Sequence, residues 1–235
     1  MLVNGNFGVA AAADTADLQP LRARLAGGSG KPIGGIAKRS ADLMIALVSF
    51  VALMPLMLMI AALIKLTMGG SVLYYQSRLG YNGRKFRCYK FRTMLMDADE
   101  RLADLVARDP DAAAEWAETR KLRNDPRVTR LGQILRKSSL DELPQLYNVL
   151  IGDMSCIGPR PIVPAEIARY GRYARDYFSV RPGITGLWQV SGRNTLTYSR
   201  RIALDRYYVR RWSLLLDAWI ALKTVKAVMA TDQTS

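Results

Sequence analysis

The longest apolar segment of the chain runs from Leu43 to Ile64, 22 residues without a charged side chain. At about 1.5 Å per residue, a straight helix of this length spans about 33 Å, which matches a hydrocarbon core about 30 Å thick. Pro55 lies just past its middle, where a proline removes a backbone hydrogen bond and kinks a helix. The pattern predicts a membrane helix with a break at Pro55.

Basic side chains flank this segment on both sides: Lys38 and Arg39 before it, then Lys65, Arg78, Arg84 and Lys85. Flanks rich in Lys and Arg stay in the cytoplasm, so both ends are expected on one side. We therefore predict a re-entrant helical hairpin over residues 35–70. A spanning helix with a tolerated proline and a helix buried in a protein core are the alternatives.

Two strands are predicted next. Residues 72–76 are mostly apolar or aromatic, and residues 85–92 alternate basic with apolar or aromatic positions. Asn82-Gly83 between them is typical of a two-residue hairpin turn. The basic positions form either a charged edge that prevents aggregation or a ridge that faces phosphate or the membrane.

The rest of the chain is predicted to be helical, so the fold class is α+β and mainly helical. Residues 97–124 read as two exposed helices with an acidic, solvated face. Residues 212–235 predict an amphipathic helix and a tail, and the helix lies either at the membrane interface or in the core. Residues 1–34 predict a mobile tail, which leaves 71–211 as a cytosolic domain.

The charge of the chain indicates the kind of partner that it binds. The 235 residues carry 34 Lys and Arg against 20 Asp and Glu, and the excess lies in residues 38–92 and 126–211. Such blocks indicate a polyanionic partner: an anionic membrane, a phosphorylated substrate or nucleic acid. The apolar segment favours the first two.

The chain contains no histidine. This excludes histidine bases and most imidazole metal sites, so any metal is expected to be a hard cation such as Mg²⁺ held by carboxylates. The two cysteines, Cys88 and Cys156, are expected to be reduced and buried.

Adjacent acids at Asp141 and Glu142 follow the cations Arg136 and Lys137. Ser139 with Glu142 fits a helix capping box, which needs no functional role. Alternatively, the pair is nucleophilic or metal-binding, and the neighbouring cations keep it ionised.

Three arginines then occur in loops with proline or glycine: Arg160 between two prolines, Arg181 before Pro-Gly, and Arg193 between Gly192 and Asn194. Rigid loops carrying arginine suit bidentate recognition of phosphate.

Four motifs together resemble a known family: KFRTM at 90–94, SLDELPQL at 139–146, IGPRP at 157–161 and RPGITGLWQVSGRN at 181–194. They are similar to the bacterial sugar transferases, monotopic phosphoglycosyl transferases that start glycan and exopolysaccharide assembly. The likeness covers about residues 31–230. The single apolar segment and the lead-in at 32–40 most resemble the galactosyl-phosphate transferases of rhizobial-type exopolysaccharide synthesis.

The resemblance implies that a hexose-1-phosphate moves from a UDP-sugar to undecaprenyl phosphate, with release of UMP, by a ping-pong mechanism. Asp141 matches the family's nucleophile, and Asp141 and Glu142 match its Mg²⁺ site. Substrate contacts are implied for the matching basic and amide positions: Lys90, Arg92, Arg136, Arg160, Arg181, Arg193 and Asn194. Galactose is the first choice of sugar, glucose the second and an N-acetylated hexosamine the third.

The resemblance also implies a re-entrant helix on the cytoplasmic face of the bacterial inner membrane, with 71–211 as the catalytic domain and anionic inner-leaflet lipids as partners. Many family members have Ser before the helix-breaking Pro, where this chain has Met54, so how the break is stabilised stays open.

A homodimer is left open and no nucleic acid is expected. A membrane-tethered scaffold for anionic lipid is the second hypothesis and a nucleic-acid binder the third; the Asp141-Glu142 pair speaks against the scaffold.

Overall fold

The computed structural model describes residues 3–4, 31–119, 122, 124–192 and 195–229, so most of the predicted N-terminal tail lies outside the described residues. The helices are α3 (Gly35–Met68), α4 (Ala98–Arg108), α5 (Pro110–Thr119), α6 (Arg130–Lys137), α7 (Gln145–Ile151), α8 (Ile167–Tyr170), α9 (Ala174–Phe178), α10 (Leu187–Val190), α11 (Tyr198–Arg211) and α12 (Leu214–Met229). The strands are β1 (Val3–Asn4), β2 (Leu73–Leu79), β3 (Lys85–Phe91), β4 (Ser155–Ile157) and β5 (Gly183–Thr185). The predicted mainly helical fold with a small hairpin is confirmed.

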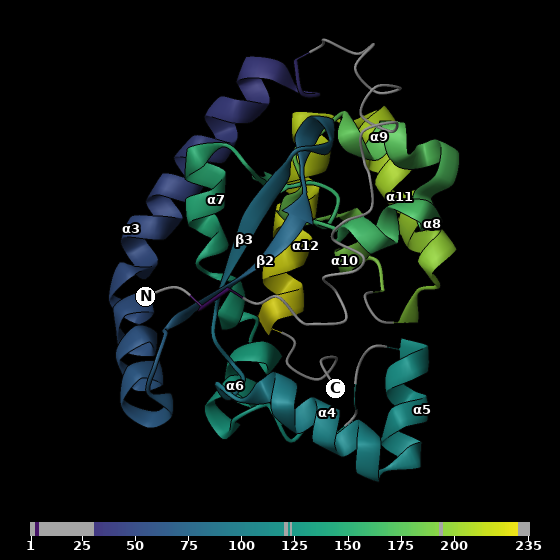
Figure 1. The fold of residues 1–235 in the computed structure, drawn as a ribbon. Coiled ribbons are helices and arrows are strands. Elements are labelled where there is room, and N and C mark those ends of the chain that lie inside the picture. The colour runs from purple at the N-terminus through teal and green to yellow at the C-terminus, as the bar shows by residue number, and fades with distance from the viewer. Residues whose placement is uncertain (1–2, 5–30, 120–121, 123, 193–194, 230–235) are drawn as a thin grey trace.

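The elements surround the β2–β3 hairpin, as Figure 1 shows. The long helix α3 runs along one side, and helices α8 to α11 cover the other. Helices α4 and α5, which match the two predicted exposed helices, extend at one end. The hairpin therefore lies between α3 and the C-terminal half of the chain.

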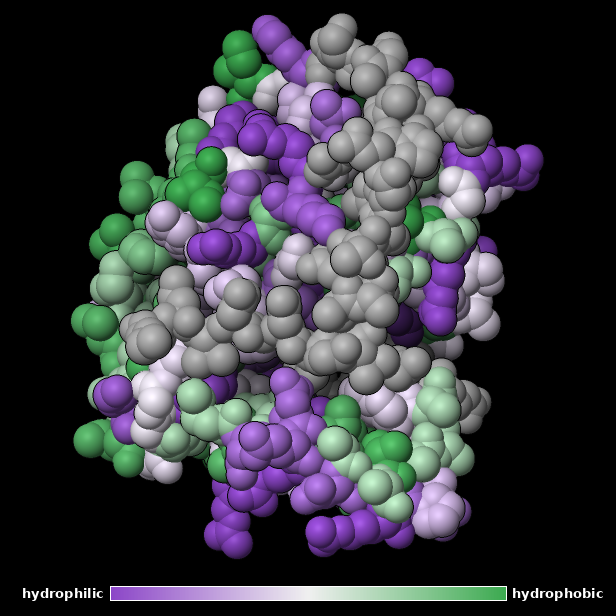
Figure 2. All heavy atoms as spheres, viewed as in Figure 1, coloured by the Kyte–Doolittle hydropathy of each residue, from purple (hydrophilic) through white to green (hydrophobic). Residues whose placement is uncertain are grey.

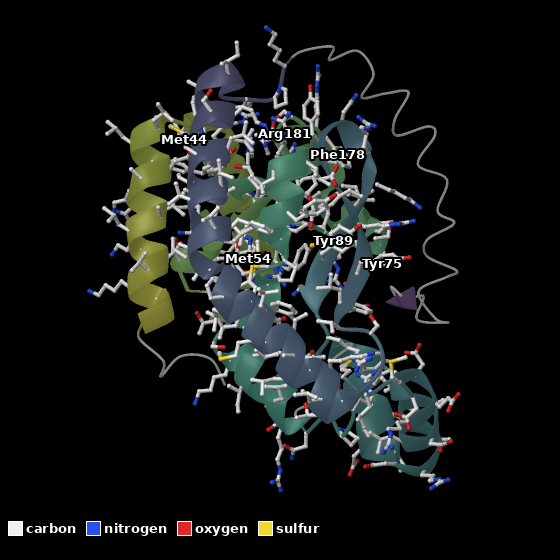
Figure 3. The ribbon with its side chains drawn as sticks, turned by 90° about the vertical axis from the view of Figure 1, so that its left-hand side faces the viewer. Met44, Met54, Tyr75, Tyr89, Phe178 and Arg181 are labelled. Atoms are coloured by element: carbon white, nitrogen blue, oxygen red, sulfur yellow. The ribbon has the colours of Figure 1, made fainter. Side chains whose placement is uncertain are left out.

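Helix α3 is continuous over 34 residues and contains Pro55 in its interior. Figure 3 shows that its axis changes direction near Met54. A proline removes one backbone hydrogen bond and displaces the preceding turn, which a bend can accommodate. The break that the sequence predicts at Pro55 is thus a bend within one helix and not a gap between two helices.

One face of α3 packs against the domain along most of its length. Ala46 in its first half belongs to the same apolar cluster as Val149 of α7, whereas Ile60 and Ile64 in its second half pack with Phe91 of β3. Ile64 is fully buried. The globular part therefore contacts α3 on both sides of the bend.

The remaining surface of α3 is apolar and exposed. Val48 and Leu66 keep 69% and 83% of their surface accessible, and the same holds for much of this face: Met44, Leu47, Val51, Leu58, Met59 and Leu63. Figure 2 shows hydrophobic atoms gathered along the edge that α3 occupies in Figure 1. A continuous apolar surface of this kind marks a membrane or protein contact.

Helix α12 has a similar division. Ile220 is fully buried against the core and Asp217 is 7% exposed, whereas Leu215 and Leu222 are 83% and 73% exposed. Apolar residues therefore lie on both its buried and its exposed side; the interfacial amphipathic character of α12 remains a prediction.

The hairpin joins its strands through a 3-10 turn, Tyr81–Gly83, in which Asn82 and Gly83 have φ of 54° and 67°. Left-handed residues at both positions suit the twist of a tight hairpin. In the antiparallel register, Tyr74 faces Lys90 and Arg78 faces Phe86. Because side chains alternate between faces, Arg78 and Lys90 point to the same side of the hairpin.

Strands β4 and β5 pair in parallel and bring together two loops that are distant in sequence. A Cβ atom added to Gly183 would collide with the backbone nitrogen of Gly158. Glycine is therefore required where these two backbones meet, and the Arg160 loop lies directly after this junction.

Asp205 of α11 is an acidic residue buried in the core. Its side chain is buried, and the hydroxyl of Tyr170 donates a hydrogen bond of 2.8 Å to Oδ2. Burial raises the pKa of Asp205 to about 7, although the Tyr170 hydrogen bond acts in the opposite direction. The folded-state pKa is thus above the unfolded value of about 3.9, so the group's contribution to stability is complete below about pH 4 and is lost as the pH rises through about 7.

We predict that Asp205→Asn makes the free energy of unfolding vary less with pH between about 4 and 7, and that the difference amounts to a few kcal/mol at most. Thermal unfolding of the purified protein in detergent across this range measures the effect. Asp104→Asn, on the exposed face of α4, is the control. An unchanged pH slope in the Asp205 variant would contradict the prediction.

Candidate active site

A short turn between α6 and α7 carries the predicted carboxylate pair. Helix α6 begins at a Thr129 cap, whose Oγ1 accepts a hydrogen bond from the Gly132 nitrogen. After α6 ends, Ser139 adopts a left-handed conformation with φ of 58°, and the 3-10 turn Leu140–Glu142 follows. A non-glycine residue in this conformation is uncommon, and strained positions of this kind cluster at functional sites.

The capping-box interpretation of Ser139 and Glu142 is not supported. The Ser139 side chain makes no capping hydrogen bond, and Oε1 of Glu142 lies 2.7 Å from Nζ of Lys90. The acid therefore turns toward β3 and not back toward the start of its own turn.

Lys90 bridges both acids. Its Nζ lies 2.7 Å from Oε1 of Glu142 and 3.7 Å from Oδ2 of Asp141. Nη2 of Arg160 lies 3.7 Å from the same Glu142 oxygen. The Arg160 side chain is 41% exposed and that of Lys90 is 25% exposed, whereas Asp141 is 8% exposed, so Arg160 is more open to an incoming ligand than Lys90.

Arg136 reaches the pair from α6. Its Nε donates a hydrogen bond of 2.9 Å to Oγ1 of Thr93, and its charge lowers the pKa of Asp141. The approach depends on Gly132, because a Cβ there would collide with the carbonyl oxygen of Thr93. KFRTM and SLDEL, separate in sequence, are thus in contact.

The two acids differ electrostatically. Burial alone would raise the pKa of Glu142, but the charges of Lys90, Arg160 and Arg78 bring it down to about 2. For Asp141, burial is the larger effect, and its pKa lies above the usual value despite Lys90 and Arg136. The sequence predicts that Arg136 and Lys137 keep Asp141 ionised. Burial has the larger effect and raises the pKa of Asp141, although the charge of Arg136 acts in the expected direction.

Arg78 of β2 belongs to this cluster and was not among the predicted site residues. Its Nη1 donates a hydrogen bond of 3.1 Å to the carbonyl oxygen of Pro161, next to Arg160. The two-residue alternation of the hairpin places it on the Lys90 face. That periodicity is the signal that could have found it.

Two predicted arginines lie elsewhere. Arg92 is buried, and its Nη2 donates to the carbonyl oxygens of Met68 and Gly69 at the end of α3. Nε of Arg181 donates to the carbonyl oxygen of Gly152, which follows α7, whereas the acids precede that helix. The structure does not bring Arg92 or Arg181 to the pair, and Arg193 and Asn194 lie outside the described residues.

The carboxylate pair is the predicted Mg²⁺ site. Among the residues that the structure describes, no three or more Asp, Glu, Cys or His side chains form a metal-ligand group. Mg²⁺, however, is often held by one or two carboxylates together with substrate phosphates. The adjacent acids Asp141 and Glu142 fit that mode, with Lys90 already beside them.

Residues 33–231 match the family model described as bacterial sugar transferase. The chain belongs to the bacterial sugar transferase family. Over 201 residues it is 51% and 52% identical to the exopolysaccharide production protein ExoY of Sinorhizobium fredii and of Rhizobium meliloti, covering 86% of this chain and 89% of each relative.

A third relative of this sugar transferase is the undecaprenyl-phosphate galactose phosphotransferase of Salmonella typhimurium. It is 47% identical over 196 residues, which are 83% of this chain and 41% of that protein. The resemblance that the four motifs indicate is confirmed.

Asn148 of α7 links the two elements that carry the site. Its Oδ1 accepts a hydrogen bond of 3.1 Å from the Tyr89 nitrogen, and its Nδ2 donates one of 2.7 Å to the Arg87 carbonyl oxygen. The side chain is fully buried. This amide ties α7, which follows the acids, to the strand that carries Lys90.

We predict that Asn148→Ala lowers the free energy of unfolding by about 2–4 kcal/mol, because a fully buried amide and its hydrogen bonds to two partly buried backbone groups are lost. Differential scanning calorimetry in detergent should show a Tm lower by roughly 5–10 °C. Gln133→Ala on the exposed side of α6 is the control and should change little. A Tm shift no larger than that of the control would refute the structural role of Asn148.

Proposed function

We propose that this sugar transferase moves a hexose-1-phosphate from a UDP-sugar to undecaprenyl phosphate and releases UMP. The observation that carries the proposal is the buried Asp141, adjacent to Glu142 and surrounded by Lys90, Arg136 and Arg160. Phosphoryl transfer depends mainly on positioning and on neutralising negative charge, and this cluster provides a carboxylate nucleophile within a cationic frame.

The proposed reaction has two displacements at one phosphorus atom. In the first, an Asp141 oxygen bonds to the sugar-bearing phosphorus while its bond to the bridging oxygen of the pyrophosphate breaks, and UMP leaves. In the second, an oxygen of undecaprenyl phosphate attacks the same phosphorus and releases the Asp141 carboxylate. Burial of Asp141 favours attack because a poorly solvated carboxylate loses little hydration.

The cations have separate roles in this scheme. Arg160, which is more exposed than Lys90, contacts the donor's phosphates. Lys90 holds both acids and neutralises charge between them. Arg136, fixed by Thr93, stabilises the ionised form of Asp141. Asp141 and Glu142 would hold Mg²⁺, which supplies further positive charge against the pyrophosphate when bound.

The sugar is proposed from the relatives. The galactose phosphotransferase of Salmonella typhimurium favours galactose as the first choice, with glucose second. Exopolysaccharide synthesis is proposed as the pathway because two of the relatives are named exopolysaccharide production proteins. A panel of UDP-sugars scored for UMP release distinguishes the sugars.

A position on the cytoplasmic face of the inner membrane is also part of the proposal. Lys38 near the start of α3 forms a 2.9 Å ion pair with Asp217 of α12, and the end of α3 is held by Arg92 of the domain. If α3 spanned the bilayer, one compact domain would have to reach both surfaces. The two attachments support a re-entrant position, with anionic lipids bound through the basic surface.

We predict that Asp141→Asn lowers UMP release by at least about 10³-fold, as expected for loss of a nucleophile. The assay contains UDP-galactose, undecaprenyl phosphate and Mg²⁺. Asp104→Asn, on exposed α4, should retain full activity. Turnover near the wild-type rate in the Asp141 variant would disprove the assigned mechanism.

We predict that cysteines at Ser40 and Thr67, both exposed and on opposite sides of Pro55, react with a membrane-impermeant maleimide from the same side. Both should be modified in inside-out vesicles and neither in right-side-out vesicles. The native cysteines are buried, so background labelling should be low. Labelling of the two sites from opposite sides would establish a spanning helix.

Pro55→Leu should straighten the helix and favour the spanning orientation, with a loss of activity. An unchanged labelling pattern in that variant would show that Pro55 does not determine the topology.

A further inference from the structure

The loop that carries Arg160 rests on the end of strand β2. The Leu79 nitrogen donates a hydrogen bond of 2.9 Å to the carbonyl oxygen of Ile162. The hydroxyl of Tyr177 joins the same two residues, because it donates to the Leu79 carbonyl and accepts from the Ile162 nitrogen. The loop is therefore held from β2 at a position two residues after Arg160.

Arg78 adds a second attachment one residue closer to Arg160. Its Nη1 donates to the Pro161 carbonyl oxygen at 3.1 Å and lies 3.8 Å from Oε2 of Glu166. That Glu166 oxygen accepts a hydrogen bond from the Val163 nitrogen. Arg78 thus holds the Arg160 loop directly and also through Glu166.

The Arg78 side chain itself is poorly placed to contact substrate. It is 17% exposed, against 41% for Arg160. Its Nη2 donates a hydrogen bond of 2.6 Å to Gln76 Oε1, so both ends of the guanidinium are engaged. Burial and the neighbouring Arg160 both lower its pKa, so placing two guanidinium groups here carries an electrostatic cost.

We propose that Arg78 is a positioning residue, which holds the Pro161 carbonyl and thereby directs the Arg160 guanidinium toward Glu142 and the donor's phosphates. The inference rests on the proposed transferase function. A planar guanidinium can bond two acceptors at fixed angles, whereas a lysine ammonium acts as a point charge. The position therefore requires arginine and not only a positive charge.

A different role for Arg78 would be purely electrostatic, since its charge also contributes to the low pKa of Glu142. The two roles predict different results for a lysine substitution. If charge alone matters, Arg78→Lys retains activity; if position matters, Arg78→Lys loses most of what Arg78→Gln loses.

The test is a double-mutant cycle with the full-length protein in detergent. UMP release is measured for the wild type, Arg78→Gln, Arg78→Lys, Arg160→Gln and the Arg78→Gln/Arg160→Gln double variant. We expect Arg160→Gln to lower kcat/KM by about 10²-fold and Arg78→Gln by about 10- to 100-fold. The double variant should match Arg160→Gln within about threefold, because Arg78 acts through Arg160.

Arg87→Gln is the matched control, because Arg87 lies on the opposite face of the hairpin over the Tyr75 ring; its activity should stay within about twofold. Tm is recorded for every variant, and if Arg78→Gln does not fold, the cycle is run with Arg78→Lys. Losses that multiply in the double variant, or near-wild-type activity in Arg78→Lys, would overturn the inference. An inactive wild type with every UDP-sugar would instead refute the proposed function.

Discussion

The site depends on placing two neighbouring carboxylates in a partly buried turn. Asp141 and Glu142 repel each other when both are ionised, and burial disfavours both charges. Lys90 offsets this cost because its ammonium group lies within 3.7 Å of both acids. Without that bridge the turn would have to open to solvent or one acid would have to be protonated. The hairpin carries Lys90, α6 carries Arg136, and the two acids lie between α6 and α7. These elements therefore have to be positioned accurately relative to one another.

Much of the supporting structure consists of arginine side chains bound to backbone carbonyl groups. Arg39 donates to the Val149 and Leu150 carbonyl oxygens, and Arg181 to that of Gly152, so two guanidinium groups complete the C-terminal end of α7. Cations at a helix C-terminus also interact favourably with its dipole. Arg92 acts in the same way at the end of α3. Part of the chain's positive charge is therefore used to join elements and is not available to bind phosphate.

Some arginines lie beside the carboxylate pair and others join structural elements, so the sequence alone predicts only part of the site. The long uncharged apolar segment predicted α3, and the alternating pattern with Asn82-Gly83 predicted the hairpin, because both features depend on short-range sequence. The motifs predicted the acids together with Lys90, Arg136 and Arg160, which the structure brings together. Arg181 lies in an equally suggestive loop, yet it faces the wrong end of α7, because that outcome depends on how distant loops pack. Arg78 was missed because the two-residue alternation that places it on the Lys90 face does not by itself identify a contact with Pro161; that contact depends on how the loop after β4 packs against β2.

Helix α3 is held in place relative to the carboxylate pair by several side-chain contacts. Lys38 of α3 forms ion pairs with Asp42 of its own helix and Asp217 of α12, and all three side chains are buried. A buried ion pair contributes little net stability, but its strict geometry suits a joint that must hold one orientation. Because α3 is also joined to α7 by Arg39 and to β3 by Arg92, it cannot tilt without moving the elements that surround Asp141. The exposed apolar face of α3 and the height of the carboxylate pair above it are therefore set together by one rigid set of contacts.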